Sequence, residues 1–169
     1  MKFHGAHMVL GAVAAGLALG IDQTHKWWML TVYHIAEKRI VPVTPFLDLV
    51  LAWNTGVSYG WLRQDSELGR WLLIGFTAVA VVCLAVWLAT SHNRLTALAV
   101  GLMIGGALGN GADRVIHGAV ADFFSFHAYG FYWYIFNLAD VAIVAGVVLL
   151  LYDIIAERWR VPSTGDRQG

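Results

Sequence analysis

Asp140 lies near the start of a largely apolar segment, Tyr132–Ala156, which also contains Asp153 near its end. A carboxylate in such a segment is costly, and ionisable groups within membrane segments are functional candidates by default. Asn137 precedes it by three residues and therefore shares its helix face. If the helix begins near Tyr132, Asp140 lies about 12 Å along it, at about 1.5 Å per residue. Two polar groups on one face predict a built site, and pairing with Arg114 or capping of a helix end is the structural alternative.

Three further acidic residues accompany Asp140 in the sequence. Asp113 and Arg114 are adjacent at the expected end of another apolar segment, where a solvated or networked ion pair is the usual role. Asp122 follows a run of small and apolar residues and fits a surface loop as well as a site. Asp22 and Lys26 are spaced i, i+4, which predicts a structural salt bridge.

Several carboxyl groups near one another suggest two kinds of function. When two carboxyl groups share a site, one is ionised and the other keeps its proton, because both cannot ionise at short range. An ionised group can then activate water while a protonated group polarises a carbonyl, as in an aspartic peptidase. The alternative from the same residues is a small proton- or ion-coupled membrane transporter.

The other reactive residue types do not form a recognisable site. The seven histidines include no HExxH pair, so a zinc protease is not expected. The one cysteine, Cys83, lies in an apolar run and leaves no intramolecular disulfide or cysteine-rich metal site. Gly101, Gly105 and Gly109 are spaced by four within an apolar segment, which is typical of close helix packing. No metal site is therefore expected.

Composition indicates which elements must position these residues. Of the 169 residues, 59% are hydrophobic and only 13% are charged, whereas soluble domains carry roughly 25% charged residues. This composition is typical of an integral membrane protein and argues against a disordered chain, a coiled coil or a secreted disulfide scaffold. Eleven basic residues balance eleven acidic ones, so no basic field exists to attract nucleic acid.

Apolar length predicts an all-α membrane bundle of four transmembrane helices. A bilayer core needs about 20 apolar residues per helix, and every span must satisfy its own backbone groups. The expected helices cover residues 5–29, 69–91, 95–114 and 132–156, in a single domain of residues 1–160 with a flexible tail at 161–169. A cleaved signal peptide is the alternative for the first segment, but no convincing small-residue cleavage site follows it.

The segment between the first two helices, residues 31–68, is too long for a simple connector. Its β-branched and aromatic residues predict short strands over Val41–Val43 and Phe46–Trp53, and Val57–Leu62 fits a short interfacial helix. With four spans, this loop and the polar candidates above gather in the same half of the membrane. The basic residues of the two halves do not decide which half is cytoplasmic.

Five short segments stand out in order along the chain. They are Asp22-Gln23-Thr24-His25-Lys26, Asn54-Thr55-Gly56-Val57-Ser58-Tyr59-Gly60, Gly109-Asn110-Gly111-Ala112-Asp113-Arg114, Gly118-Ala119-Val120-Ala121-Asp122-Phe123 and Phe136-Asn137-Leu138-Ala139-Asp140. Together they resemble the signature segments of bacterial lipoprotein signal peptidase, or signal peptidase II. The resemblance covers nearly the whole chain and implies an intramembrane aspartic peptidase, which we expect to act as a monomer.

The resemblance implies that Asp122 and Asp140 are the catalytic pair, a choice that the residues alone leave open. The surrounding substrate-binding or site-organising positions then fall on Asn54, Gly56, Asn110, Asp113, Arg114, Asn137, Asp22 and Lys26. The family removes signal peptides from prolipoproteins by cutting before a diacylglyceryl-modified cysteine. The implied partners are this lipidated substrate, which enters laterally, and membrane lipid, with neither a metal nor an organic cofactor.

The resemblance also implies an orientation. The chain is expected to be a multi-pass protein of the bacterial inner membrane, with both termini cytoplasmic and the active site toward the periplasmic face. Two of the segments depart from the family pattern: His25 replaces a hydroxyl residue, and Ser58-Tyr59 replaces Ala-Phe. None of these positions belongs to the expected catalytic pair.

Overall fold

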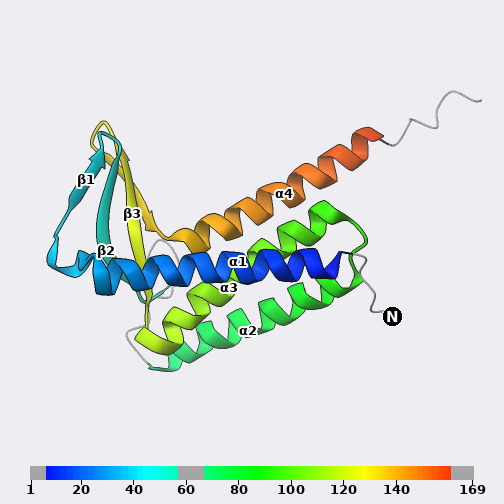
Figure 1. Ribbon diagram of the computed structural model, residues 1–169, viewed down its shortest axis with the longest axis horizontal. Helices are drawn as coiled ribbons and strands as arrows, with labels where there is room; N and C mark the ends of the chain where they lie inside the picture. Colours follow the sequence, from blue (N-terminus) through cyan, green and yellow to red (C-terminus); the bar gives the residue numbers. More distant parts are fainter. Residues whose placement is uncertain (1–6, 57–66, 161–169) are drawn as a thin grey trace, which may run out of the picture.

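The computed structural model describes residues 7–56 and 67–160, and the expected helix at Val57–Leu62 and the tail at 161–169 lie outside this part. The described helices are α1 (Met8–Trp27), α2 (Glu67–Thr90), α3 (Arg94–His117) and α4 (Leu138–Arg160). The described strands are β1 (Val41–Thr44), β2 (Leu47–Asn54), β3 (Val120–Ala128) and β4 (Phe131–Phe136). The strands form a sheet at the end of the bundle where α1 ends and α4 begins (Figure 1).

Three of the described helices are long and apolar enough to cross a membrane, namely α2, α3 and α4 as far as Ala156. Large apolar side chains such as Phe76 and Val148 are exposed on these helices, as expected where lipid is the solvent. The membrane character predicted from composition therefore agrees with the fold. Helix α1 is not among these three, and its last turns carry Asp22 and Lys26.

Helix α3 lies at the centre of the bundle and contacts the other three helices. A Cβ added at Gly101 or Gly105 would collide with backbone atoms of α1, so these glycines let the two helices approach closely. The packing role predicted from the four-residue glycine spacing is confirmed. Further along the chain, α4 leans away from α1 and α2 toward its C-terminal end (Figure 1).

The sheet is antiparallel throughout, with the strand order β1-β2-β3-β4. The strands expected over Val41–Val43 and Phe46–Trp53 are confirmed to within one residue as β1 and β2. The hairpin of β3 and β4 was not expected. Its two-residue turn, Tyr129-Gly130, has positive φ at both positions, which is the geometry of the turns that suit the twist of a hairpin.

The predicted start of the fourth helix near Tyr132 was wrong. Residues Phe131–Phe136 pair with β3 as a strand, and α4 begins only at Leu138. Asp140 therefore lies in the first turn of α4 and not about two turns inside it. The physical reason is that a short aromatic and apolar run satisfies a strand as well as a helix, and the neighbouring strand decides between them.

The sheet is fastened to the bundle by a small apolar core. Met29, in a π-helical turn over Trp28–Val32 that continues α1, packs with Ile35, Ala121 and Phe123. All four side chains are at most 1% exposed. The start of β3 is therefore held against the end of α1, which places Asp122, between two of these core residues, at the end of the bundle.

Candidate active site

Four elements bring polar side chains together where the sheet meets the helices. Asp122 comes from the start of β3, Asp140 and the preceding Asn137 from the start of α4, Asn110 from α3 and Asn54 from the end of β2. The structure therefore brings together residues that lie as far as 86 positions apart in the sequence. The expected gathering of the polar candidates at one end of the bundle is confirmed.

Asp122 is buried, with 2% of its surface exposed. Its Oδ1 accepts a hydrogen bond from Nδ2 of Asn137 at 2.6 Å, and its Oδ2 accepts one from Nδ2 of Asn54 at 3.2 Å. The sheet register explains the second contact. Ala52 pairs with Asp122 and Asn54 pairs with Val120, so Asn54 and Asp122 are diagonal neighbours on one face of the sheet.

Asp140 is half-buried and caps the helix on which it lies. Its Oδ2 accepts the backbone N–H of Asn137 at 3.1 Å, while the backbone N–H of Asp140 donates to Oδ1 of Asn137 at 3.0 Å. This reciprocal pair is a capping box, and a helix N-terminus favours negative charge. Asp140 therefore does cap a helix end, as the structural alternative predicted. It also accepts a hydrogen bond on Oδ1 from Nδ2 of Asn110 at 2.8 Å.

Two amide side chains link the carboxyl groups. Nδ2 of Asn137 donates to Asp122 and also to Oδ1 of Asn110 at 3.0 Å, and Asn110 donates onward to Asp140. Asn137 is fully buried, so its hydrogen bonds are costly to lose. The chain Asp122–Asn137–Asn110–Asp140 fixes the two carboxyl groups relative to each other.

The environment of Asp122 favours its protonated form. Burial, and next the charge of Asp140, raise the pKa of Asp122 to about 7, although hydrogen bonds from Asn137 and Asn54 and the charge of Lys26 oppose the shift. Desolvation disfavours a carboxylate, and a second carboxylate nearby adds repulsion. The site thus pairs a carboxyl that holds its proton near neutral pH with one that sits at a helix N-terminus.

The sequence suggested that Arg114 pairs with Asp113 or with Asp140, but its hydrogen bonds go elsewhere. Its guanidinium donates to backbone carbonyls, to Asn110 at 3.3 Å and to Gly56 at 3.4 Å. The N–H of Gly56 in turn donates to Oδ1 of Asn54 at 3.1 Å. Arg114 therefore ties the end of β2 to α3 and fixes the amide that reaches Asp122.

Asp113 pairs instead with Lys26, with 2.9 Å between Nζ and Oδ2. Lys26 also pairs with Asp22 at 2.9 Å, so the predicted i, i+4 salt bridge is confirmed. Gln23, which the sequence analysis did not select, donates to Asp22 at 3.2 Å and to Asp113 at 3.0 Å. The sequence feature that could have identified Gln23 is its position between Asp22 and Lys26 in a polar helix end.

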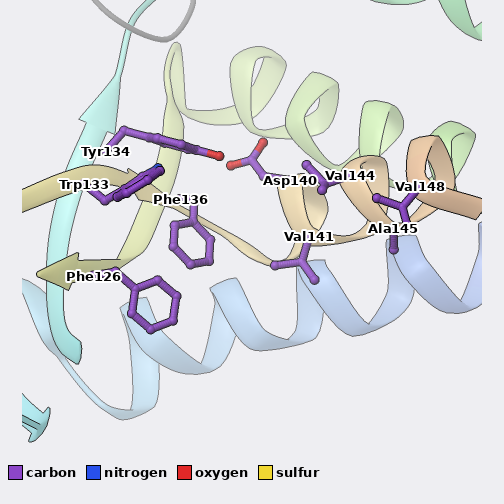
Figure 2. Close-up of a pocket in the computed structure, with 9 residues that line it drawn as sticks. All are labelled: Phe126, Trp133, Tyr134, Phe136, Asp140, Val141, Val144, Ala145 and Val148. Atoms are coloured by element: carbon purple, nitrogen blue, oxygen red, sulfur yellow. The ribbon is translucent and has the colours of Figure 1, made fainter. Parts of the chain in front are cut away.

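Two hollows meet at Asp140. The smaller, of about 210 Å³, is lined by Asp122 and Asp140 together with Asn54, Asn110, Arg114 and Tyr134. The larger, of about 550 Å³, is an open apolar groove between the sheet and α4. Figure 2 shows Phe126, Trp133, Tyr134 and Phe136 on the sheet side of this groove, valines of α4 on the other side, and Asp140 between them.

Tyr134 belongs to both hollows, and the sequence analysis missed it. Its hydroxyl points toward the carboxyl of Asp140 in Figure 2. It was assigned to the start of a helix, and only the strand β4 aims it at the site. In the part of the chain that the structure describes, no group of three or more His, Cys, Asp or Glu side chains is arranged to hold a metal ion.

Known proteins are similar to this chain in sequence and in fold. The family model of signal peptidase II matches residues 14–156. A lipoprotein signal peptidase of Nitrobacter hamburgensis is 55% identical over 147 residues, which cover 85% of this chain and 90% of that protein. Another, of Beijerinckia indica, is 51% identical over 156 residues, which cover 92% and 93%.

Solved structures agree with these matches. A bacterial membrane enzyme determined by the in meso method at 2.3 Å resolution has a TM-score of 0.77 with this chain at 25% identity, over 95% of this chain and 93% of that one. A second such enzyme, at 1.9 Å resolution, has a TM-score of 0.74 at 26% identity. With a family model that spans most of its length and relatives that share about half of their residues with it, the chain belongs to the signal peptidase II family.

Proposed function

We propose that this protein is a membrane aspartic endopeptidase that removes signal peptides from prolipoproteins and cuts before the diacylglyceryl-modified cysteine. One observation carries the proposal: Asp122 and Asp140 line the same small cavity at one end of the bundle. Family membership supports the substrate class, and it gives no support to the transporter alternative.

The two carboxyl groups divide the chemistry. Asp140, at the helix N-terminus and in the more open position, acts as the base and takes a proton from the attacking water. Asp122, whose pKa is raised to about 7, holds a proton and gives it to the carbonyl oxygen of the scissile peptide. As these protons move, the oxygen of water bonds to the carbonyl carbon and a gem-diol forms. The C–N bond then breaks as Asp140 passes its proton to the leaving amine, and a hydroxyl of the gem-diol returns a proton to Asp122 as the new carboxyl group forms.

Five further residues organise this pair in the proposal. Asn137 and Asn110 hold the spacing of the carboxyl groups, Asn54 holds Asp122, and Arg114 and Gly56 hold Asn54. We assign Asp22, Lys26 and Asp113 to the support beneath the site, because they pair with one another and the two carboxylates accept hydrogen bonds from backbone N–H groups next to the carboxyl pair.

The apolar groove beside Asp140 suits the lipid part of the substrate. It runs from Asp140 along Val141, Val144 and Val148 on the outer face of α4, and all three valines are exposed. A lipidated precursor can slide into this groove from the bilayer and keep its acyl chains in an apolar environment. The peptide bond beside the modified cysteine would then lie at the small cavity of Asp122 and Asp140, which adjoins the groove at Asp140.

We also propose four membrane spans, with α1 as the fourth beside the three apolar helices, in the bacterial inner membrane. An even number of spans puts both termini on one side, which is the cytoplasm, and the sheet with its carboxyl pair on the periplasmic side. Reporters fused after Ser91 and at the C-terminus should then read as cytoplasmic, and one near Lys38 as periplasmic. A cytoplasmic reading at Lys38 would contradict this topology.

Purified protein and a lipidated precursor give the direct test. The precursor should be shortened on a gel by the wild-type protein, and Asp122→Asn and Asp140→Asn should each abolish the shift while the protein remains folded in detergent. Cleavage should persist in EDTA and in thiol-reactive or serine-directed inhibitors. Loss of cleavage in EDTA that zinc restores would overturn the aspartic mechanism.

A further inference from the structure

A buried ionic cluster lies beneath the carboxyl pair. We call it the support cluster, and its members are Asp22, Gln23, Lys26 and Asp113. Asp22, Lys26 and Asp113 are each at most 3% exposed. Buried charges are stable only when partners and hydrogen bonds compensate them. The contacts of this cluster are therefore costly to break, and they hold the elements that carry them in fixed positions.

The two carboxylates of the support cluster have matching surroundings. Each accepts a hydrogen bond from the Lys26 ammonium, at 2.9 Å in both cases. Each also accepts one from the side-chain amide of Gln23, at 3.2 Å for Asp22 and 3.0 Å for Asp113. Lys26 and Gln23 therefore cross-link the end of α1 to α3 through both carboxylates.

The third donor to each carboxylate is a backbone N–H, and its identity connects the cluster to the site. Asp22 accepts the N–H of Ala139 at 2.9 Å, and Asp113 accepts the N–H of Ala121 at 3.0 Å. Ala139 is the residue directly before Asp140, and Ala121 is the residue directly before Asp122. Each support carboxylate thus holds the peptide that leads into one member of the carboxyl pair.

Close packing leaves these contacts little freedom. Gly109 of α3 faces Asp22, and a Cβ added there would lie 2.6 Å from Oδ2 of Asp22 and 3.3 Å from Cβ of Ala139. Ala121 and Ala139 are themselves fully buried. Lys26 also donates to Oδ1 of Asn110 at 3.3 Å, so the cluster touches the amide chain between the carboxyl groups as well.

We propose that Asp22 and Asp113, cross-linked by Gln23 and Lys26, are positioning residues that set the separation of Asp122 and Asp140 through the peptide N–H groups of Ala121 and Ala139. The proposal rests on the proposed function of the carboxyl pair and deepens it, because it adds Gln23 and explains how remote charges act on the reaction.

The sharpest variant is Gln23→Leu, which removes both amide cross-links and leaves both ion pairs of Lys26 in place. We expect kcat for the lipidated precursor to fall by about 10- to 100-fold, because a misplacement on the order of 1 Å costs about 100-fold in rate. KM should change by less than about twofold, because the apolar groove is untouched. Lys26→Arg, which keeps a cationic donor, should retain more activity than Lys26→Met.

The pH profile separates positioning from simple destabilisation. A changed separation changes the repulsion between the two carboxyl groups, so the alkaline limb of kcat should move in Gln23→Leu. The double variant Asp22→Asn/Asp113→Asn should be hardly slower than the slower single variant, because residues that act as a unit are non-additive. Losses that simply multiply would show that the two carboxylates act independently and would overturn the cross-linking.

Asp153→Asn is the matched control. Asp153, like Asp140, is a carboxylate of α4, but it lies at the opposite end of the bundle. It accepts hydrogen bonds from Nδ2 of Asn93 and from Oγ1 of Thr96 at 2.7 Å each. It should lower the melting temperature without changing kcat or the pH profile. The proposal fails if Gln23→Leu behaves like Asp153→Asn, whereas failure of the proposed function itself would appear as cleavage that survives Asp122→Asn.

Discussion

Asp122 should keep its proton up to nearly neutral pH, and replacing it by asparagine should remove a pH-dependent loss of stability. The substitution keeps the size of the side chain and one oxygen that accepts hydrogen bonds. It removes the charge that the buried site disfavours. The effect should therefore be seen both in folding and in the pH dependence of cleavage.

The magnitude follows from the pKa of Asp122, which is raised from 3.8 to about 7 by burial and by the charge of Asp140. A carboxyl whose pKa is higher in the folded state contributes stability that is fully present below pH 3.8 and is lost as the pH rises to about 7. The difference of about 3 units, at about 1.4 kcal/mol per unit, amounts to on the order of 4 kcal/mol.

Two measurements test this reasoning. Carboxyl ¹³C signals of labelled protein in detergent should include one that titrates near pH 7 and is missing in Asp122→Asn. Unfolding experiments should show that the wild type loses stability between about pH 4 and pH 7 by the amount above, and that the variant loses less. The kcat of the wild type should fall about tenfold per pH unit above this range, since the acid is then ionised.

The control is Asp153→Asn, which removes a carboxyl far from the site. It should leave the titration near pH 7 and the slope of stability against pH unchanged. If the signal assigned to Asp122 titrates near pH 4 instead, burial and the neighbouring charge do not act as argued. The assignment of Asp122 as the proton donor would then be wrong.

Three other outcomes are expected. Asp122→Asn and Asp140→Asn should each lower kcat by at least about 10⁴-fold, with the double variant hardly worse, as gel assays of precursor cleavage would show; near-normal turnover in either would disprove the pair. An unlipidated precursor should have a much lower kcat/KM than the lipidated one, because each buried CH₂ contributes about 0.8 kcal/mol; equal values would refute lipid recognition. Gly109→Ala should lose about 1–3 kcal/mol of stability through the collision with Asp22, whereas Gly16→Ala, which meets no atom within 4 Å, should be tolerated in the same thermal unfolding assay.

Local patterns sufficed for a good part of the fold. Long apolar segments predicted α2 and α3 closely, because a span in lipid must satisfy its backbone within the helix. The β-branched and aromatic runs predicted β1 and β2. The i, i+4 spacing of Asp22 and Lys26 predicted their salt bridge.

The same patterns failed between residues 118 and 137. The aromatic run Phe131–Phe136 fits either a strand or the start of a helix, and only its pairing with β3 decides. Asp113 and Arg114 looked like partners because they are adjacent. In the fold, Asp113 faces Lys26, whereas Arg114 reaches the carbonyl of Gly56.

What the sequence determined by itself is a membrane bundle with carboxyl groups gathered at one end, because apolar length and the number of spans fix which residues share a side. Residue type and spacing left open which carboxyl groups meet, and the tertiary structure places Asp122 and Asp140 in one cavity. Asp122 reaches Asp140 through the β2–β3 register, the hairpin turn at Tyr129-Gly130 and the amides of Asn137 and Asn110. These contacts join distant parts of the chain, so no local spacing encodes them. Within the support cluster the i, i+4 pair of Asp22 and Lys26 follows from spacing, whereas the contacts with the peptides of Ala121 and Ala139 form only once the fold brings the elements together.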